Sequence, residues 1–240
     1  MKLIAIDDGH GLETAGKRTP FLPGTKQFMH ENEFNSVTAG YLKANLERCG
    51  FRTLMVAPGD ADTPLKVRSG TANNAKTDFY IAVHANASKG IWGLWGGIDT
   101  FYYPGSVEGK KAATIIHKYL VQGTVLKNRG VKEENFHVLR ETHMTSVLVE
   151  CGFMDNLKEA KLLMSDVYRR ECAEEICKGI CEYFGVAYAS EKPAIEEVVM
   201  FAHGKLLEDE AYWIKKALIE KPIYQLLLNF KNREEGRKII

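Results

Sequence analysis

The sequence predicts an α/β fold: a mostly parallel, twisted sheet with helices on both faces, followed by a short C-terminal helical region. From residue 2 to about residue 186, short apolar runs bounded by turn residues alternate with segments of helical periodicity. Strands that alternate with helices pair in parallel and place the helices on both faces of the sheet. The chain has 240 residues, 45% of them apolar, which is enough for one full-sized domain with a small appendage.

Each element follows from its local pattern. Apolar runs predict strands over Leu3–Asp7, Thr53–Ala57, Phe79–His84, Ile98–Tyr103, His137–Leu139 and Ser146–Glu150. Helical periodicity predicts helices over Glu33–Cys49, Leu65–Ala75, Val107–Val121, Leu157–Met164 and Tyr168–Phe184. Because the carboxyl ends of parallel strands lie at one edge of a sheet, the polar residues that end these strands are expected to gather there.

The pattern changes after Tyr188, so residues 1–188 are expected to form the main domain. Residues 189–194, which include a proline, are interpreted as a linker to a small helical region over residues 195–240. Its two helix-like stretches are Ile195–Leu206 and Asp209–Phe230, the second broken or kinked at Pro222. A region of roughly fifty residues is near the lower limit for independent folding. It is therefore expected to dock on the main domain, to form a homodimer or to bind a target.

Bulk properties exclude two classes of partner. A formal net charge of +1, without a long run of lysine and arginine, gives no pull toward nucleic acid. No apolar run has the length that membrane insertion requires.

The apolar run after Met1 is too short for a signal-peptide core and is followed at once by two aspartates. The chain is therefore expected to be made in the cytoplasm without a signal peptide.

The five cysteines are odd in number and lack a disulfide-scaffold spacing, so reduced thiols are expected. Three of them, Cys172, Cys177 and Cys181, fall on one predicted helix. A soft second metal site there is conceivable, but without a CxxC pair ordinary helix packing is the favoured interpretation. Cys151 is interpreted in the same way, as packing at a strand end.

Two histidines directly follow or end predicted strands. His10 lies between two glycines after the first strand, where small neighbours leave room for a ligand and no helix face explains the imidazole. His84 ends the apolar run that begins at Phe79 and precedes a small polar pair. Both are therefore candidate metal ligands. The other five histidines lack this setting.

Carboxylates complete a possible metal centre. Glu31 and Glu33 compete for a third ligand position, and either could instead balance the dipole at the start of a helix. Glu150 ends a late buried strand. Two imidazoles and one carboxylate are a ligand set with which catalytic zinc keeps a position open for water, and an additional glutamate is the usual proton carrier. The sequence therefore predicts a zinc hydrolase.

Five ordered motifs resemble those of the zinc-dependent N-acetylmuramoyl-L-alanine amidases of the Amidase_3 family, over about residues 1–186. In that family a strand ends in Asp-x-Gly-His-Gly, Glu-x-x-apolar-Asn opens a helix, Arg-x-x-x-Ala-Asn precedes a strand ending in His-Ala-Asn, and a late strand ends in Val-Glu-x-Gly-Phe. The corresponding segments here are Asp7–Gly11, Glu31–Asn35, Arg68–Asn73, His84–Asn86 and Val149–Phe153. The C-terminal region lies outside the resemblance.

The resemblance implies roles for single residues. Its second motif selects Glu31 over Glu33, so His10, Glu31 and His84 would hold one Zn²⁺ ion. Glu150 would take a proton from water and pass it to the leaving amine. The substrate would be bacterial peptidoglycan, cleaved at the amide between N-acetylmuramic acid and the L-alanine of the stem peptide.

Departures from the family pattern are small. Asp8 and Leu12 replace a common proline and glycine, and Ala82 stands where serine is frequent. Thr145 and Ser146 replace a proline and a small alanine. None of these changes removes a ligand or the catalytic carboxylate, so activity is expected.

Other residues near these motifs have two interpretations each. Asp7 either orients a ligand imidazole or caps the strand end. Asn86, Arg68 and Asn73 are plausible supports of the site, and the last two are equally plausible as packing or helix-surface residues.

The loop after His84 and one further glutamate are also open. Trp92 and Trp95 either stack on a sugar or peptide face or pack the loop down. Glu141 is a further carboxylate that is a candidate to face the cleft.

Three functions compete. The first is a wall-degrading amidase, either a phage or prophage endolysin or a host autolysin; the expected absence of a leader favours an endolysin that acts after release. The second is a zinc endopeptidase that cleaves within the wall peptides. The third is a non-catalytic wall-binding module, against which the retained His10, Glu31, His84 and Glu150 argue. Wall targeting is the favoured role for the apolar side chains of residues 195–240.

Overall fold

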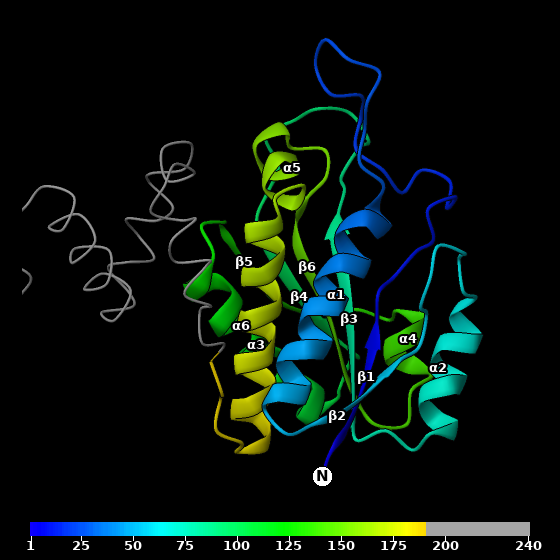
Figure 1. Cartoon of the computed structure of the whole chain (residues 1–240), viewed down its shortest axis with the longest axis vertical. Helices are drawn as coiled ribbons and strands as arrows, with labels where there is room; N and C mark the ends of the chain where they lie inside the picture. Colours follow the sequence, from blue (N-terminus) through cyan, green and yellow to red (C-terminus); the bar gives the residue numbers. More distant parts are fainter. Residues whose placement is uncertain (191–240) are drawn as a thin grey trace, which may run out of the picture. The chain divides into compact units, whose positions relative to one another are not determined.

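A computed structural model describes residues 1–190 of the chain, of which Met1–Ala189 form one compact unit (Figure 1). The predicted helical region over residues 195–240 and most of the predicted linker lie outside the described residues. Within residues 1–190, no helix combines the length and the apolar character needed to cross a membrane.

Six strands form a single sheet in the order β2-β1-β3-β6-β4-β5. The strands are β1 (Leu3–Asp7), β2 (Arg52–Met55), β3 (Phe79–Asn86), β4 (Ile98–Tyr102), β5 (Asn128–Glu133) and β6 (Thr145–Phe153). The pairs β1–β2, β1–β3, β3–β6 and β4–β5 are parallel, whereas β4 runs antiparallel to β6. The predicted α/β fold with a mostly parallel sheet is confirmed.

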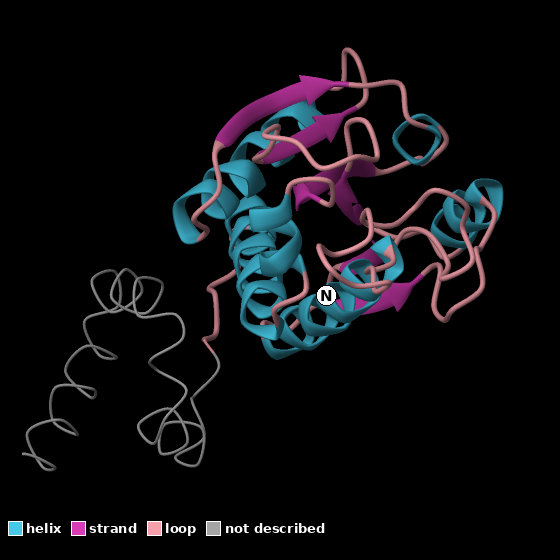
Figure 2. Cartoon of the chain, turned by 90° about the horizontal axis from the view of Figure 1, so that it is seen from above, coloured by secondary structure: helices cyan, strands magenta, loops and turns pink. Residues whose placement is uncertain are grey.

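Helices cover both faces of the sheet (Figures 1 and 2). They are α1 (Glu31–Arg48), α2 (Leu65–Asn74), α3 (Val107–Gly123), α4 (His137–Arg140), α5 (Leu157–Leu163) and α6 (Asp166–Phe184). Buried residues of α1, α3 and α6 share the larger apolar cluster, and residues of α2 and α4 share the smaller one. The sheet therefore has a thick core on one face and a thin core on the other.

The central strand β3 shows why these residues form a buried sheet. Successive side chains of a strand point to opposite faces. Phe79, Ile81 and Val83 enter the larger cluster, whereas Tyr80 and Ala82 enter the smaller one. A strand covered on both faces is apolar at nearly every position, which explains the continuous run seen in the sequence.

One predicted element is wrong and one was missed. Residues His137–Leu139, predicted as a strand, begin the short helix α4, whose Val138 and Leu139 pack in the smaller cluster. Three residues are too few to distinguish a strand period from a helix period. The strand β5 was missed because it lies at the edge of the sheet and its sequence, NRGVKE, has one apolar side chain.

Three elements extend further than predicted at the ends that carry candidate site residues. The helix α1 begins at Glu31 rather than Glu33, and β3 runs on to Asn86. The strand β6 continues to Phe153, so Glu150 lies inside it rather than at its end.

Candidate active site

The carboxyl end of β1 brings His10 close to β3. Gly9 adopts a positive φ of 70°, a conformation that L side chains rarely adopt. A Cβ at Gly9 would lie 2.8 Å from Cε1 of His84, closer than real Cβ atoms approach. The glycine before His10 is therefore required both by the turn and by the approach of the second imidazole.

The three predicted ligands converge. Nδ1 of His84 lies 2.9 Å from Oε1 of Glu31, and Nε2 of His10 lies 3.6 Å from Oε2 of the same carboxylate. The two imidazole rings meet edge to face with centroids 5.2 Å apart. One donor atom from each residue lies within 4.8 Å of the other two. Residues from β3, the start of α1 and the loop after β1 thus form one cluster.

The N-terminus of α1 distinguishes the two competing glutamates. The Glu33 side chain is exposed, and its Oε2 accepts the backbone N–H of His30 at 2.5 Å, which makes it part of the helix cap. Glu31 is 1% exposed and faces the imidazoles. Nδ2 of Asn35, one turn along the helix, donates to Oε1 of Glu31 at 3.3 Å. Glu33 therefore supports the helix, and Glu31 is the residue in the cluster.

Two buried carboxylate oxygens in this cluster have no hydrogen-bond partner within the described residues. They are Oε2 of Glu31 and Oε2 of Glu150. A buried carboxylate oxygen without a donor is costly, so such atoms indicate a missing positive ligand or water. Two imidazole nitrogens and a carboxylate oxygen are donors that zinc accepts. The residues present therefore fit a divalent cation of this kind.

The protonation states agree with that fit. Burial lowers the pKa of His10 to about 4, so its imidazole is neutral at pH 7, the form that binds metal. Burial alone would raise the pKa of Glu31, but the hydrogen bond with His84 and the nearby charges of His84, His10 and Lys17 lower it to about 2. Glu31 is therefore ionised although its side chain is buried.

Glu150 lies beside the cluster because β6 pairs with β3. The register places Glu150 directly opposite His84, and β4 places Asp99 on the other side of Glu150. Burial, followed by the negative charge of Glu31, raises the pKa of Glu150 well above its ordinary value. The structure thus places the fourth predicted residue next to the three donors, with a carboxyl group that holds a proton readily.

Asp7 was one candidate to orient a ligand imidazole, but its hydrogen bonds go to other groups. Its carboxylate accepts from Nη1 of Arg68 at 3.0 Å, from the hydroxyl of Tyr80 at 2.6 Å and from the N–H of Gly9 at 3.0 Å. Neither imidazole is among these partners. Asp7 therefore caps the end of β1 and fixes Arg68, which is itself 2% exposed.

Glu141 does not face this cluster. It is exposed, pairs with Arg140, and precedes β6 on the side of the sheet where that strand begins. From Thr145 to Glu150 the strand rises roughly 17 Å, at about 3.3 Å per residue. Nδ2 of Asn73 donates to the backbone oxygen of Glu141, so this motif asparagine holds α2 to the chain after α4.

The loop between β3 and β4 is held down by its indole groups. Nε1 of Trp92 donates to the backbone oxygen of Phe21 at 3.0 Å, and Nε1 of Trp95 donates to Oδ1 of Asp155 at 2.5 Å. The packing interpretation of both tryptophans is therefore favoured. Asp155 also accepts three backbone N–H groups of residues 88–90.

Three residues of the site region were not singled out in the sequence. Asn35 orients Glu31, Asp155 organises the loop after β3, and Nζ of Lys17 lies 3.6 Å from Oε2 of Glu31. Asn35 had a signal, because it closes the Glu-x-x-apolar-Asn motif. Lys17 had none, because it sits in a long loop without periodicity.

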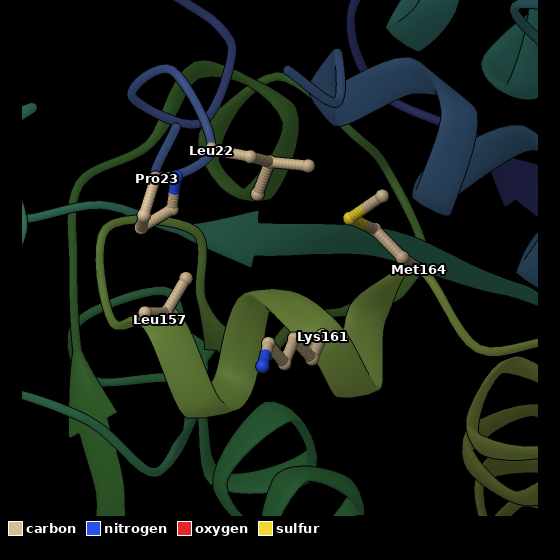
Figure 3. A pocket seen from close by; sticks show the side chains of 5 residues that line it. All are labelled: Leu22, Pro23, Leu157, Lys161 and Met164. Atoms are coloured by element: carbon tan, nitrogen blue, oxygen red, sulfur yellow. The ribbon is translucent and has the colours of Figure 1, made fainter. Parts of the chain in front are cut away.

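An apolar hollow lies between the loop before α1 and the helix α5 (Figure 3). Figure 3 shows Leu22 and Pro23 on one side, with Leu157, Lys161 and Met164 of the α5 region on the other. None of the four predicted site residues lines this hollow. The polar cluster therefore marks the candidate centre, and the hollow is a separate feature.

Comparison with known proteins agrees with this geometry. The family model of N-acetylmuramoyl-L-alanine amidases, Amidase_3, matches residues 4–182. The N-acetylmuramoyl-L-alanine amidase CwlM of Bacillus licheniformis is 30% identical over 192 residues, which cover 78% of this chain and 70% of that protein.

Solved structures share the fold. The catalytic domain of CwlV, an N-acetylmuramoyl-L-alanine amidase from Bacillus (Paenibacillus) polymyxa var. colistinus, matches with a TM-score of 0.70 and 31% identity, over 78% of this chain and 100% of its own. An N-acetylmuramoyl-L-alanine amidase from Clostridium difficile 630 matches with a TM-score of 0.70 and 28% identity, over 77% and 97%. The chain belongs to the Amidase_3 family of N-acetylmuramoyl-L-alanine amidases.

Proposed function

We propose that this protein hydrolyses the amide bond between N-acetylmuramic acid and the L-alanine of peptidoglycan stem peptides, with one Zn²⁺ ion as its cofactor. One observation carries the proposal: His10, Glu31 and His84 converge, and Glu150 lies in register beside them. The family supplies the identity of the bond.

His10, Glu31 and His84 are the proposed metal ligands. Zn²⁺ at such a set lowers the pKa of a water molecule toward ~7 and polarises a carbonyl oxygen. Burial keeps the His10 imidazole neutral, and Glu31 stays ionised, so a neutral imidazole and an anion face the same point. Asn35 holds the Glu31 carboxylate from the adjacent turn of α1.

Glu150 is the proposed proton carrier. Its carboxylate takes a proton from the attacking water and later gives that proton to the nitrogen of the leaving L-alanine. Burial, followed by the negative charge of Glu31, raises the pKa of Glu150. A cation held by Glu31 would offset the second of these causes and so favour release of the Glu150 proton.

A buried hydrogen-bond network beside the proposed site supports this chemistry. Asp7, Arg68 and Tyr80 form a buried network that joins the end of β1 to α2 and to the first part of β3, and β1 and β3 are the two strands that lead to His10 and His84. A rigid base of this kind holds ligands in place.

Product analysis tests the proposed bond. Purified cell walls are digested with zinc-loaded protein, and the newly exposed groups are identified. New L-alanine amines without new reducing sugar ends are expected. Reducing ends would instead identify a glycosidase, amines on other residues an endopeptidase, and wall binding without any new group a non-catalytic module. Glu150→Gln protein serves as the matched inactive control.

Residues 195–240 are proposed to target the wall, with self-association as the alternative. A chain ending at residue 190 should hydrolyse small soluble muropeptides as the full chain does, yet bind and lyse whole walls poorly. Unchanged wall binding by a chain that has lost dimerisation would instead assign the region to self-association. The expected phage or prophage origin stays a prediction.

A further inference from the structure

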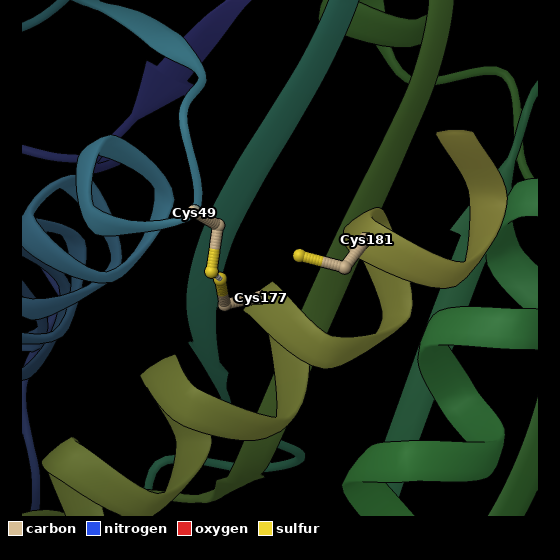
Figure 4. Close-up of side chains that lie close together, drawn as sticks. All are labelled: Cys49, Cys177 and Cys181. Atoms are coloured by element: carbon tan, nitrogen blue, oxygen red, sulfur yellow. Dashed lines mark hydrogen bonds between the residues drawn. The ribbon is translucent and has the colours of Figure 1, made fainter. Parts of the chain in front are cut away.

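A second group of potential metal ligands lies at the other end of α1. Cys49 caps the C-terminus of α1, and Cys177 and Cys181 lie one turn apart on α6. Their sulfur atoms all lie within 4.8 Å of one another. Figure 4 shows the three side chains directed into the space between the end of α1 and α6.

The spacing of these sulfurs fits a shared cation. Sγ of Cys49 lies 3.8 Å from Sγ of Cys177, and both residues are free thiols. Two sulfurs bound at 2.3 Å to a tetrahedral ion are about 3.8 Å apart. A disulfide would require about 2.05 Å. The thiols thus lie at the separation of metal ligands, in hydrogen-bond contact and without a disulfide.

Sequence periodicity suggested a different trio. Cys172 shares α6 with Cys177 and Cys181, yet it lies outside the group, and Cys49 takes its place from 128 residues away. Cys172 and Cys151 are equally buried in the same apolar core. Their thiols interact with each other as a separate pair, and they provide a control for the three grouped thiols.

We propose that Cys49, Cys177 and Cys181 form a second metal site, which takes a thiophilic divalent cation such as Zn²⁺ or Cd²⁺. Thiolates select soft and borderline metals over the hard cations that oxygen ligands prefer. The site is separate from the cluster of His10, Glu31 and His84, and it does not depend on the proposed hydrolysis.

Three thiolates and a divalent ion would need a nearby positive charge and a fourth ligand, and groups of both kinds lie close to Cys49. Such a centre carries one excess negative charge, and Arg48, the residue before Cys49, donates through Nε to the oxygen of Ala189 at 2.9 Å. The N–H of Ala189 points at Sγ of Cys49 at 3.3 Å, and its carbonyl oxygen lies 3.9 Å from the same sulfur. That carbonyl, which also accepts from Nε of Arg48, is a candidate for a fourth ligand, because zinc in closed sites takes four.

Metal binding would join three parts of the main unit. Cys49 ends α1, Cys177 and Cys181 belong to α6, and Ala189 is the last residue of the compact unit. An ion held there would tie Ala189 to the end of α1 and to α6. The expected role of the site is therefore structural.

Cadmium titration of the reduced full-length chain tests the proposal. Cadmium bound to thiolates gives an intense ultraviolet charge-transfer band, which a centre of imidazole and carboxylate cannot give. The band should appear in the wild type and saturate by two equivalents, because the cluster of His10, Glu31 and His84 can bind one of them without adding to the band. It should persist in His84→Ala, which lacks a ligand of the other cluster, and in Cys172→Ala. It should be lost in the Cys177→Ala/Cys181→Ala double variant.

Two results would overturn the site. One is a folded, reduced wild-type chain without the band, which requires no variant and so does not depend on variant folding. The other is a band of full intensity in the double variant whose circular dichroism matches the wild type. Zinc content should agree: Cys172→Ala retains the zinc of the wild type, and the double variant loses one equivalent.

Discussion

The two ends of α1 carry two different donor clusters, and the contrast shows which kind of evidence points to catalysis. Glu31 begins the helix and Cys49 caps it 18 residues later, about 27 Å away at 1.5 Å per residue. At the first end, Oε2 of Glu31 and Oε2 of the neighbouring Glu150 have no hydrogen-bond partner among residues 1–190. At the second end, thiols lie in an apolar core that tolerates them.

The helix dipole acts in opposite directions on the two ends. The positive N-terminus of α1 stabilises the anion at Glu31, whereas the negative C-terminus disfavours a thiolate at Cys49. The first end is thus charged even before a cation binds, whereas burial raises the pKa of the Cys49 thiol at the second end. An ion at the first end is expected to serve chemistry, and an ion at the second end is expected to serve packing.

Removal of a metal ligand at the first end should have the largest effect on turnover, and it tests the difference between the two ends directly. His84→Ala and His10→Ala should each lose the zinc of that centre and all measurable wall hydrolysis, because two remaining donors bind the ion weakly. Metal content and release of L-alanine amines check this. His143→Ala, which changes an exposed histidine, is the control. Normal zinc content in both ligand variants would refute the ligand assignment.

The proton carrier should show a smaller but still large effect. Glu150→Gln should keep its zinc and wall binding yet lose turnover by roughly two to four orders of magnitude, the usual worth of an acid–base group. Glu141→Gln removes an exposed carboxylate and should act as the wild type does. Near-normal turnover in Glu150→Gln would assign proton transfer to another group.

The network under the first end should matter for stability. Arg68→Met leaves the buried Asp7 carboxylate without its ionic partner, and breaking such a pair costs about 3–5 kcal/mol of unfolding free energy. Urea denaturation measures this cost. Lys43→Met breaks an exposed pair with Glu47 and should cost less than ~1 kcal/mol. Equal losses of unfolding free energy in the two variants would show that the buried Asp7–Arg68 pair contributes no more to stability than an exposed pair.

The smallest effect on turnover is expected at the second end. Cys177→Ala should leave hydrolysis within about twofold of the wild type, since Cys177 lies about a helix length from Glu31. In metal-free protein, its unfolding free energy should fall by about 1 kcal/mol, typical of a buried substitution. A large loss of turnover in a folded variant would contradict the separation of the two ends.

Much of the site was predictable because parallel strands collect their carboxyl ends at one edge. His10 and His84 were found as polar residues at the ends of apolar runs, and the structure brings them together through β1 and β3. The choice of Glu31 over Glu33 needed the motif, since both glutamates suit a helix start. The environment of Asp7 was not predictable, because its partners Arg68 and Tyr80 lie 61 and 73 residues away.

By itself the sequence determined the alternation of strands and helices, the family and the four polar residues of the candidate centre, because period and motif are local properties of the chain. Only the tertiary structure decided that β5 is an edge strand, that Glu141 lies away from the centre, and that Cys49 replaces Cys172 beside the other thiols. Such neighbours arise from the packing of α1 against α6 and of strands within the sheet. Packing joins residues that no periodicity relates, and it therefore decides which buried groups can act together.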